Sequence, residues 1–160
     1  MLMTSTTPQE ELEALSRKLQ QIYSLVLATE RQFDNSPGGL ALLDRLVNDP
    51  AWAWLRPLSA LNAEIDHALA QSQAPTVYDH AVVAAHVRGL IAGENDLRHD
   101  PFLDRYRPLL QLNPELAAAH GELKVLLKNA PSESADEGER LHRRHQWNER
   151  VTHRRADKHS

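Results

Sequence analysis

The 160-residue chain contains no cysteine. Disulfides and thiolate chemistry are therefore excluded, and any metal site has to be built from histidine, aspartate and glutamate. No apolar run approaches the roughly 20 residues that cross a membrane. Residues 1–7 lack the charged start and the apolar core of a secretory signal. We therefore expect a soluble cytoplasmic protein that does not enter a membrane.

The sequence also lacks the short motifs of common catalytic and nucleotide-binding sites. Neither a Gly-x-Gly-x-x-Gly nor a Walker sequence is present, and no serine, threonine or lysine stands in a recognisable nucleophile setting. We therefore lean toward a protein without catalytic activity, and we expect no cofactor.

The period-two alternation of β-strands is absent too, whereas helical periodicity is strong. Thr7-Pro8-Gln9-Glu10 is a capping box that starts a helix over residues 8 to about 34. Its apolar residues step by three and four: Leu12, Leu15, Leu19, Ile22, Val26, Thr29 and Phe33. This stripe indicates packing within the monomer, and heptad spacing of this kind also suits a homodimer seam.

Further helices follow along the chain. A short one is predicted to carry Leu40, Leu43, Leu46 and Val47, and a capping box formed by Thr76 and Asp79 precedes a helix over 81–92 that stops at Gly93. We predict an all-α, bundle-like single domain of six or seven helices over residues 7–130.

One stretch of the sequence occurs twice, near 49–65 and near 100–116, which suggests an internal duplication of a helical unit. Convergence on a common way to open a helix explains part of the match, since Asp-Pro is such an opening. In each copy we expect a short helix, a bend at Arg-Pro and a continuation, to about Gln73 in the first copy and to a second break at Asn113-Pro114 in the other. The identical positions are Asp49-Pro50, Arg56-Pro57-Leu58, Leu61-Asn62 and Glu64, against Asp100-Pro101, Arg107-Pro108-Leu109, Leu112-Asn113 and Glu115.

The charge is unevenly distributed. Residues 140–160 carry seven Arg or Lys against two acids, whereas residues 1–139 carry eleven against twenty. Such a basic tail can attract an acidic partner or fold back on its own acidic body. We read 131–160 as a polar linker and a basic tail that is flexible, with a helix loosely docked through Trp147 as the other possibility.

Three residues are candidates for binding. A duplicated unit places Arg56 and Arg107 symmetrically, where two guanidinium groups can converge on a carboxylate or phosphate. The structural alternative is that each arginine covers carbonyls exposed by the following proline or pairs with a nearby acid such as Asp49 or Asp100. Trp52 and Trp54 cannot share a helical face, so we expect one in the core and the other, with Trp54 as the candidate, as a surface anchor.

The candidates for a metal site are Glu64, His67 and His120. Glu64 and His67 have the Glu-x-x-His spacing found in di-iron bundles. The second copy has Ala118 where the second histidine would stand, and a lone histidine is more often a hydrogen-bonded core residue.

We therefore interpret the chain as a non-catalytic module that binds another macromolecule: a protein partner, or a second copy through an amphipathic helix face. One alternative is a metal-containing bundle enzyme or small-ligand sensor. A second is nucleic-acid binding through the basic tail, which the acidic body makes unlikely by repelling phosphate.

Overall fold

The computed structural model describes residues 6–34, 50–91 and 101–157, and within these ranges every regular element is helical. The all-α prediction is confirmed for them. The elements are α1 (Pro8–Asp34), the 3-10 helix η1 (Pro50–Leu55), α3 (Arg56–Leu69), α4 (Val77–Ile91), α5 (Pro101–Leu112), α6 (Pro114–Lys128) and α7 (Glu137–Asp157). The helix predicted around Leu40–Val47 and the stop at Gly93 lie outside the described residues.

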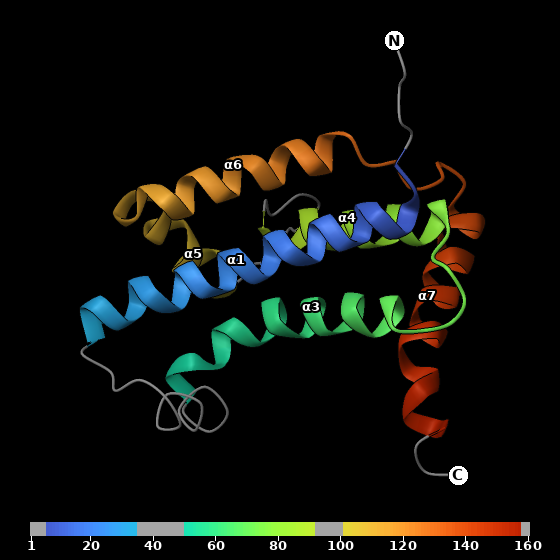
Figure 1. The fold of residues 1–160 in the computed structure, drawn as a ribbon, viewed down its shortest axis with the longest axis horizontal. Helices are drawn as coiled ribbons and strands as arrows, with labels where there is room; N and C mark the ends of the chain where they lie inside the picture. The colour runs from blue at the N-terminus through green and yellow to red at the C-terminus, as the bar shows by residue number, and fades with distance from the viewer. Residues whose placement is uncertain (1–5, 35–49, 92–100, 158–160) are drawn as a thin grey trace.

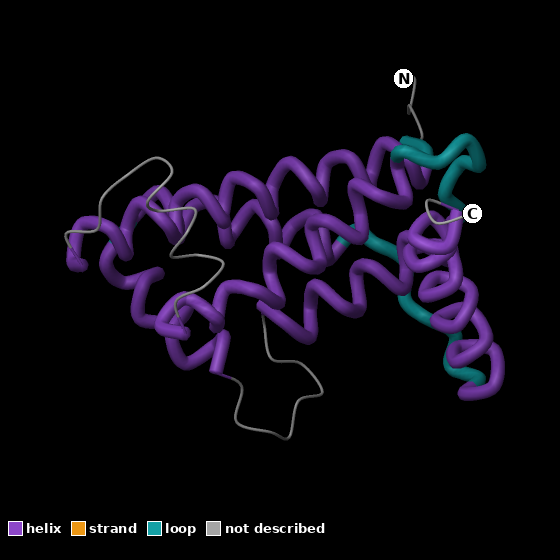
Figure 2. Tube along the Cα trace, turned by 90° about the horizontal axis from the view of Figure 1, so that it is seen from below, coloured by secondary structure: helices purple, strands orange, loops and turns teal. Residues whose placement is uncertain are grey.

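Helix α1 is the central element of the fold. It packs against α3, α4, α5 and α6, and it lies between α3 and α6 in Figure 1. Helix α7 stands across one end of the other helices, as Figures 1 and 2 both show, and contacts α3 and α4 there. The result is a bundle of roughly lengthwise helices closed at one end by a crossing helix.

The start and the packing face of α1 are as predicted. The Glu10 backbone N–H donates to Thr7 Oγ1 at 3.1 Å, which is half of the expected capping box, and α1 begins at Pro8. From Leu12 to Thr29 every residue of the stripe is buried. The stripe packs within the chain, so a homodimer would have to use another face.

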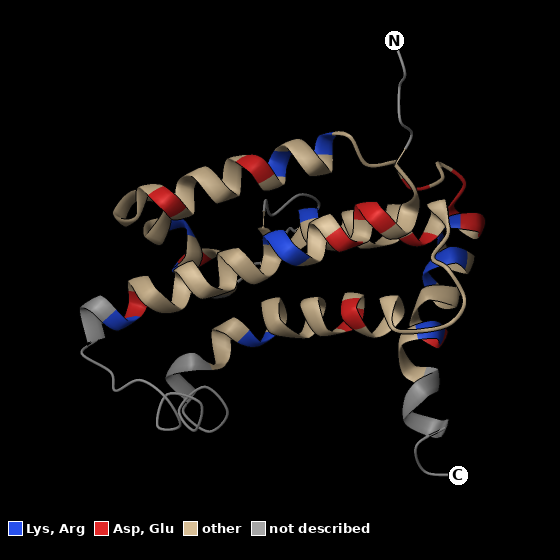
Figure 3. Cartoon of the chain, in the orientation of Figure 1, with Lys and Arg blue, Asp and Glu red and all other residues tan. Residues whose placement is uncertain are grey.

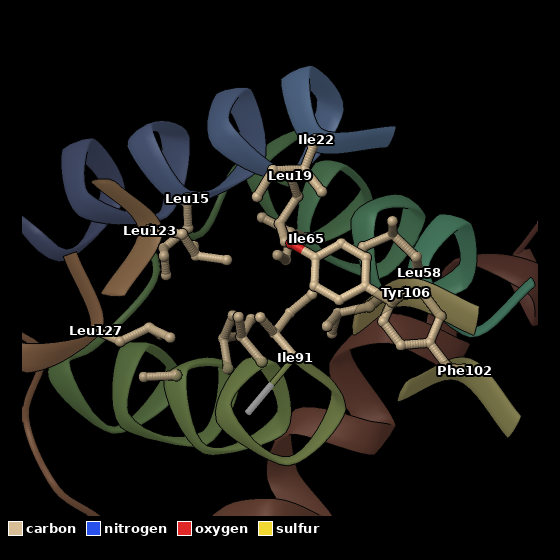
Figure 4. Close-up of a cluster of buried hydrophobic side chains, with 14 of the residues drawn as sticks. Leu15, Leu19, Ile22, Leu58, Ile65, Ile91, Phe102, Tyr106, Leu123 and Leu127 are labelled. Carbon is tan, nitrogen blue, oxygen red and sulfur yellow. The ribbon is translucent and has the colours of Figure 1, made fainter. Parts of the chain in front are cut away.

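Side chains from every described helix, including η1 and α7, belong to one core, and Figure 4 shows a part of it. Leu15, Leu19 and Ile22 of α1 face Leu58 and Ile65 of α3, and side chains of α4, α5 and α6 close the cluster. Burial of such a side chain contributes about 1.5–3 kcal/mol to the free energy of folding. This shared core holds the helices that line the groove described below.

Helix α4 has no exposed side chain between residues 79 and 91. Its capping box is the predicted one, because the Thr76 N–H donates to Asp79 Oδ2 at 2.9 Å and the Asp79 N–H donates to Thr76 Oγ1 at 3.2 Å. The helix spans Val77–Ile91, and its buried residues fall on every side of it: Asp79, His80, Ala81, Val82, Val83, Ala84, Val87 and Ile91.

The two copies of the repeated stretch differ in structure. In the first, η1 gives way to α3 at Arg56-Pro57 as expected, although α3 ends at Leu69. In the second, the predicted bend at Arg107-Pro108 is wrong, since α5 runs through Pro108. Pro108 is exposed, and continuing the helix buries Leu109. Packing therefore outweighs the single backbone hydrogen bond that the proline removes.

The repeated asparagines nevertheless play a similar part. Asn62 accepts a hydrogen bond from Ser16 Oγ at 3.1 Å, and Asn113 Nδ2 donates to Thr29 Oγ1 at 2.9 Å. Each copy thus fastens its asparagine to a hydroxyl of α1. Asn113 also caps α6 at the predicted break, by accepting from the Glu115 N–H at 2.9 Å. Duplication remains a hypothesis that these contacts favour.

For residues 131–160 the sequence left two possibilities, a flexible basic tail or a docked helix, and in the structure residues 137–157 form α7. Trp147 is fully buried in the common core, so the docked helix is the alternative that the structure adopts. This segment has few apolar residues because arginine side chains make part of the contact between α7 and the other helices. Arg150 lies 3.4 Å from Asp79 and donates to the Ala68 carbonyl at 3.3 Å. The basic segment thus folds back on the acidic body, and Figure 3 shows its blue residues along α7.

Candidate binding groove

An open groove of about 590 Å³ lies between α3 and α4 and is closed at one side by α7. We call it the α3–α4 groove. Its apolar lining comes from small and medium side chains of two helices, and its charged lining comes from all three and from the α6–α7 connection. The apolar residues are Pro57, Ala60, Leu61, Ala85, Gly89 and Leu90, and the charged or polar ones are Glu64, His86, Arg88, Ser132, Glu133, Arg144 and Asn148.

Helix α4 supplies the part of the groove that is least covered. Ala85, His86, Gly89 and Leu90 are only half-buried, although the opposite faces of α4 are fully buried. A Cβ placed on Gly89 would meet no atom within 4 Å. Glycine in a helix interior costs about 1 kcal/mol relative to alanine, and no contact among the described residues requires it at this position. Helix α4, whose other faces are buried, therefore presents one half-covered face of small, apolar and basic side chains to the groove.

A bidentate ion pair stands in the wall of the groove. Arg144 Nε lies 2.7 Å and Arg144 Nη2 lies 2.5 Å from the two carboxylate oxygens of Glu133. The hydrogen bonds from Arg144 lower the pKa of the Glu133 carboxyl below its ordinary 4.5. Arg88, on α4, donates to the Leu127 carbonyl at the end of α6. The basic groups of the groove are thus held in place by partners of this chain.

His86 faces both signs of charge. Burial lowers the pKa of its imidazole, Arg144 lowers it further, and Glu64 and Glu133 act in the opposite direction. The balance keeps the ring neutral near pH 7, where it can both donate and accept a hydrogen bond. The groove therefore offers a neutral imidazole between an acidic and a basic side chain.

A second, smaller cavity of about 150 Å³ adjoins the first and shares Ser132 and Glu133 with it. Its other polar lining includes Arg140 and Arg143 of α7. The Arg143 guanidinium stacks on Tyr78, 3.5 Å from the ring centroid, and this cation–π contact helps to dock α7 on α4.

The three binding candidates do not meet in one place. Arg56 is exposed at the start of α3 and Arg107 is exposed within α5, and neither lines the groove. Trp54, in η1, is half-buried; its ring lies 5.7 Å from that of Phe102 between centroids, and the Arg105 guanidinium lies 5.5 Å over it. The side chains of Trp52, Asp49 and Asp100 lie outside what the structure describes.

Each of the three metal candidates has a different environment. Glu64 lines the groove, His67 is half-buried on α3, and His120 on α6 is hydrogen-bonded through Nδ1 to the Tyr106 hydroxyl at 2.9 Å. Burial lowers the pKa of His120 and raises that of Tyr106. Among the described residues no group of three or more histidine and carboxylate side chains is arranged to hold a metal ion.

Sequence reasoning identified only one residue of the groove, Glu64, and for a different role. The motifs of the sequence do not single out His86, and Arg144 and Glu133 belong to the segment 131–160 that is predicted as a polar linker and basic tail. The available signal was the charge asymmetry, since a basic segment beside an acidic body predicts ion pairs between them. It could not say which pairs form.

Comparisons of this chain with protein-family models, curated proteins and solved structures found no match. No helix in the described ranges has both the length and the apolar character needed to span a bilayer. The fold and the groove therefore define an all-α protein with an open cleft of mixed charge, and its function has to be argued from that cleft.

Proposed function

We propose that this protein is a non-catalytic binding module that accepts a polypeptide segment of a partner protein in the α3–α4 groove. The observation that carries the proposal is the half-covered face of α4 around Gly89, beside a cavity of about 590 Å³. The other faces of α4 are buried, and a partner segment over Ala85, Gly89 and Leu90 would extend that burial to the half-covered face.

The shape and lining of the groove favour a polypeptide over a small molecule. Small-molecule sites are mostly apolar and enclose most of their ligand. This groove is open, and charged residues such as Glu64, Arg88 and Arg144 line it beside apolar ones. An apolar strip with a charged border is the usual composition of a protein-binding surface.

The contacts of α7 give less support to nucleic-acid binding. The guanidinium groups of Arg143, Arg144 and Arg150 engage Tyr78, Glu133 and Asp79 within the chain. Nucleic-acid binding relies on many Lys and Arg side chains that neutralise successive phosphates at once, and these three are already engaged within the chain.

The test is a blocking substitution, Gly89→Leu, with Gly121→Leu as its matched control. Both glycines lie within helices with no atom within 4 Å of an added Cβ, but Gly121 is an exposed residue of α6 outside the groove. A displayed library of random 12-residue peptides is selected on the unmodified protein. We expect the selected peptides to bind Gly89→Leu at least about tenfold more weakly, a loss of about 1.4 kcal/mol, and to bind Gly121→Leu unchanged.

Hydrogen exchange locates the bound peptide. Protection is expected in 57–64 of α3 and 85–90 of α4. Peptides whose affinity is equal for both variants, or a library that yields no binder, would contradict the proposal. A small molecule that co-purifies with the unmodified protein and is lost from Gly89→Leu would favour the ligand-sensor alternative instead.

A further inference from the structure

Glu133 occupies a particular place in the wall of the groove. It belongs to the irregular connection between α6 and α7, residues 129–136, and it lines both the α3–α4 groove and the smaller cavity. Its side chain is only 12% exposed, whereas that of Arg144, its partner, is 41% exposed. The carboxylate is thus the inner member of the pair, held at the junction of the two cavities.

Cationic groups gather around this one carboxylate. Arg144 binds it in a two-pronged fork, and the charge of Arg140 also lowers the pKa of its carboxyl. Arg143 lines the smaller cavity beside it. Glu64 is the other acid that lines the groove. If the Glu133 side chain rotated away, Arg140, Arg143 and Arg144 of α7 would remain beside the space that its carboxylate had filled.

The connection that carries Glu133 has its own anchors. The Ser134 carbonyl accepts a hydrogen bond from Arg140 at 3.3 Å, and the Asp136 carboxylate accepts one from the Glu139 N–H at 2.9 Å at the start of α7. Rotation of the Glu133 side chain about its own bonds can therefore open the fork while these backbone anchors stay in place.

We propose that the Arg144 fork is an anion-recognition site and that Glu133 is an internal pseudo-ligand that fills it in the free protein. The inference rests on the proposed function, and it names the chemistry of the partner segment: an anionic side chain, carboxylate or phosphorylated, that replaces Glu133 on Arg144 while the segment lies in the α3–α4 groove. Guanidinium forks match both groups, since each presents two oxygens to parallel N–H donors.

Removing the pseudo-ligand tests the proposal. The variants are Glu133→Gln and, as a control with the same change of charge, Glu139→Gln, whose carboxylate pairs with Arg143 at 3.8 Å. The control thus releases a neighbouring arginine without emptying the Arg144 fork. The reagents are inorganic phosphate, hexaglutamate and a phosphoserine hexapeptide, and binding is followed by titration calorimetry and by the NMR signal of the Arg144 Nε–H. We expect Glu133→Gln to bind at least one of these anions about tenfold more tightly than the unmodified protein or Glu139→Gln, with a shift of that signal.

The choice among the reagents identifies the source of the anion. Preference for hexaglutamate indicates an acidic segment, and preference for the phosphoserine peptide indicates a phosphorylated one. The double variant Glu133→Gln with Arg144→Gln is expected to lose the gain. If Glu133→Gln does not fold, Glu133→Asp serves, because its shorter side chain weakens the fork while keeping the charge, and a smaller gain is expected.

Three results would overturn the inference. These are equal gains in Glu133→Gln and Glu139→Gln, no gain in either, and a gain that survives loss of Arg144. Each leaves the groove proposal standing if peptides still distinguish Gly89→Leu from Gly121→Leu. Failure of that comparison with a gain specific to Glu133→Gln would instead reject the groove and keep the anion site.

Discussion

At the scale of single residues, three histidines lie where burial disfavours their charged form. Burial lowers the pKa of His80, His86 and His120 below the ordinary 6.5. Glu11 raises the pKa of His80, but this effect is smaller than that of burial. Arg88 lowers the pKa of His80 further, and Lys124 lowers that of His120. The folded protein therefore binds fewer protons than the unfolded chain in mildly acidic solution.

The consequence is a loss of stability on mild acidification. Below the unfolded pKa of 6.5 the unfolded chain takes up protons that the folded chain cannot, so the free energy of unfolding falls as the pH drops from about 6.5 toward the lower folded values. Urea unfolding at a series of pH values measures it, and His80→Gln should flatten the curve. A free energy that stays level between about pH 7.5 and 5.5 would contradict this assignment.

The Glu133 carboxyl affects the free energy of unfolding in a separate, lower pH range. Its pKa lies below the ordinary 4.5, so the stability that its pairing with Arg144 provides is present above that pH and is lost as the pH falls through the lower folded value. The two effects can be told apart because the histidines titrate first on acidification.

At the scale of helices, Gly89 and Gly121 weaken α4 and α6 without a compensating contact. An added methyl group at either position meets open space. We expect Gly89→Ala and Gly121→Ala each to raise the free energy of unfolding by roughly 0.5–1 kcal/mol, because alanine restricts the unfolded chain and favours the helix. Urea or thermal unfolding of the two variants measures this.

The comparison of the two variants also reports on the groove. If Gly89→Ala destabilises the protein while Gly121→Ala stabilises it, the space over Gly89 is filled in the free protein. In that case the open face of α4 would not be available to a partner. Equal stabilisation is the result that agrees with an open groove.

At the scale of the whole molecule, α7 is packed into the common core through Trp147, and we expect it to unfold together with the other helices. Trp147 is fully buried, and the largely buried Arg150–Asp79 pair and the hydrogen bond from Gln71 to the Arg150 carbonyl, 2.6 Å, fix the helix against α3 and α4. We expect Trp147→Ala to lower the free energy of unfolding by about 3–5 kcal/mol, measured by urea unfolding.

A control on the same helix is available in Leu141, which is exposed. Leu141→Ala should change the free energy of unfolding by no more than about 0.5 kcal/mol. A loss below about 1 kcal/mol in Trp147→Ala would mean that α7 does not share the core.

The sequence by itself determined the helical class and the features that depend on neighbours along the chain. The two capping boxes at Thr7 and Thr76 placed the starts of α1 and α4 because capping bonds join residues three apart. The α1 stripe from Leu12 to Thr29 marked its buried face because helical spacing alone puts these side chains together.

Only the tertiary structure decided what depends on contacts between distant residues. Helix α5 continues through Pro108 because the buried side chains around the proline favour a continuous helix. Helix α7 docks through Trp147 and through ion pairs of its arginines, and the sequence of this segment has no apolar stripe that would have predicted the docking. The α3–α4 groove also depends on contacts between distant residues. Glu64, His86 and Arg144 are far apart in the chain, and their meeting is set by the crossing of three helices, which local patterns do not encode.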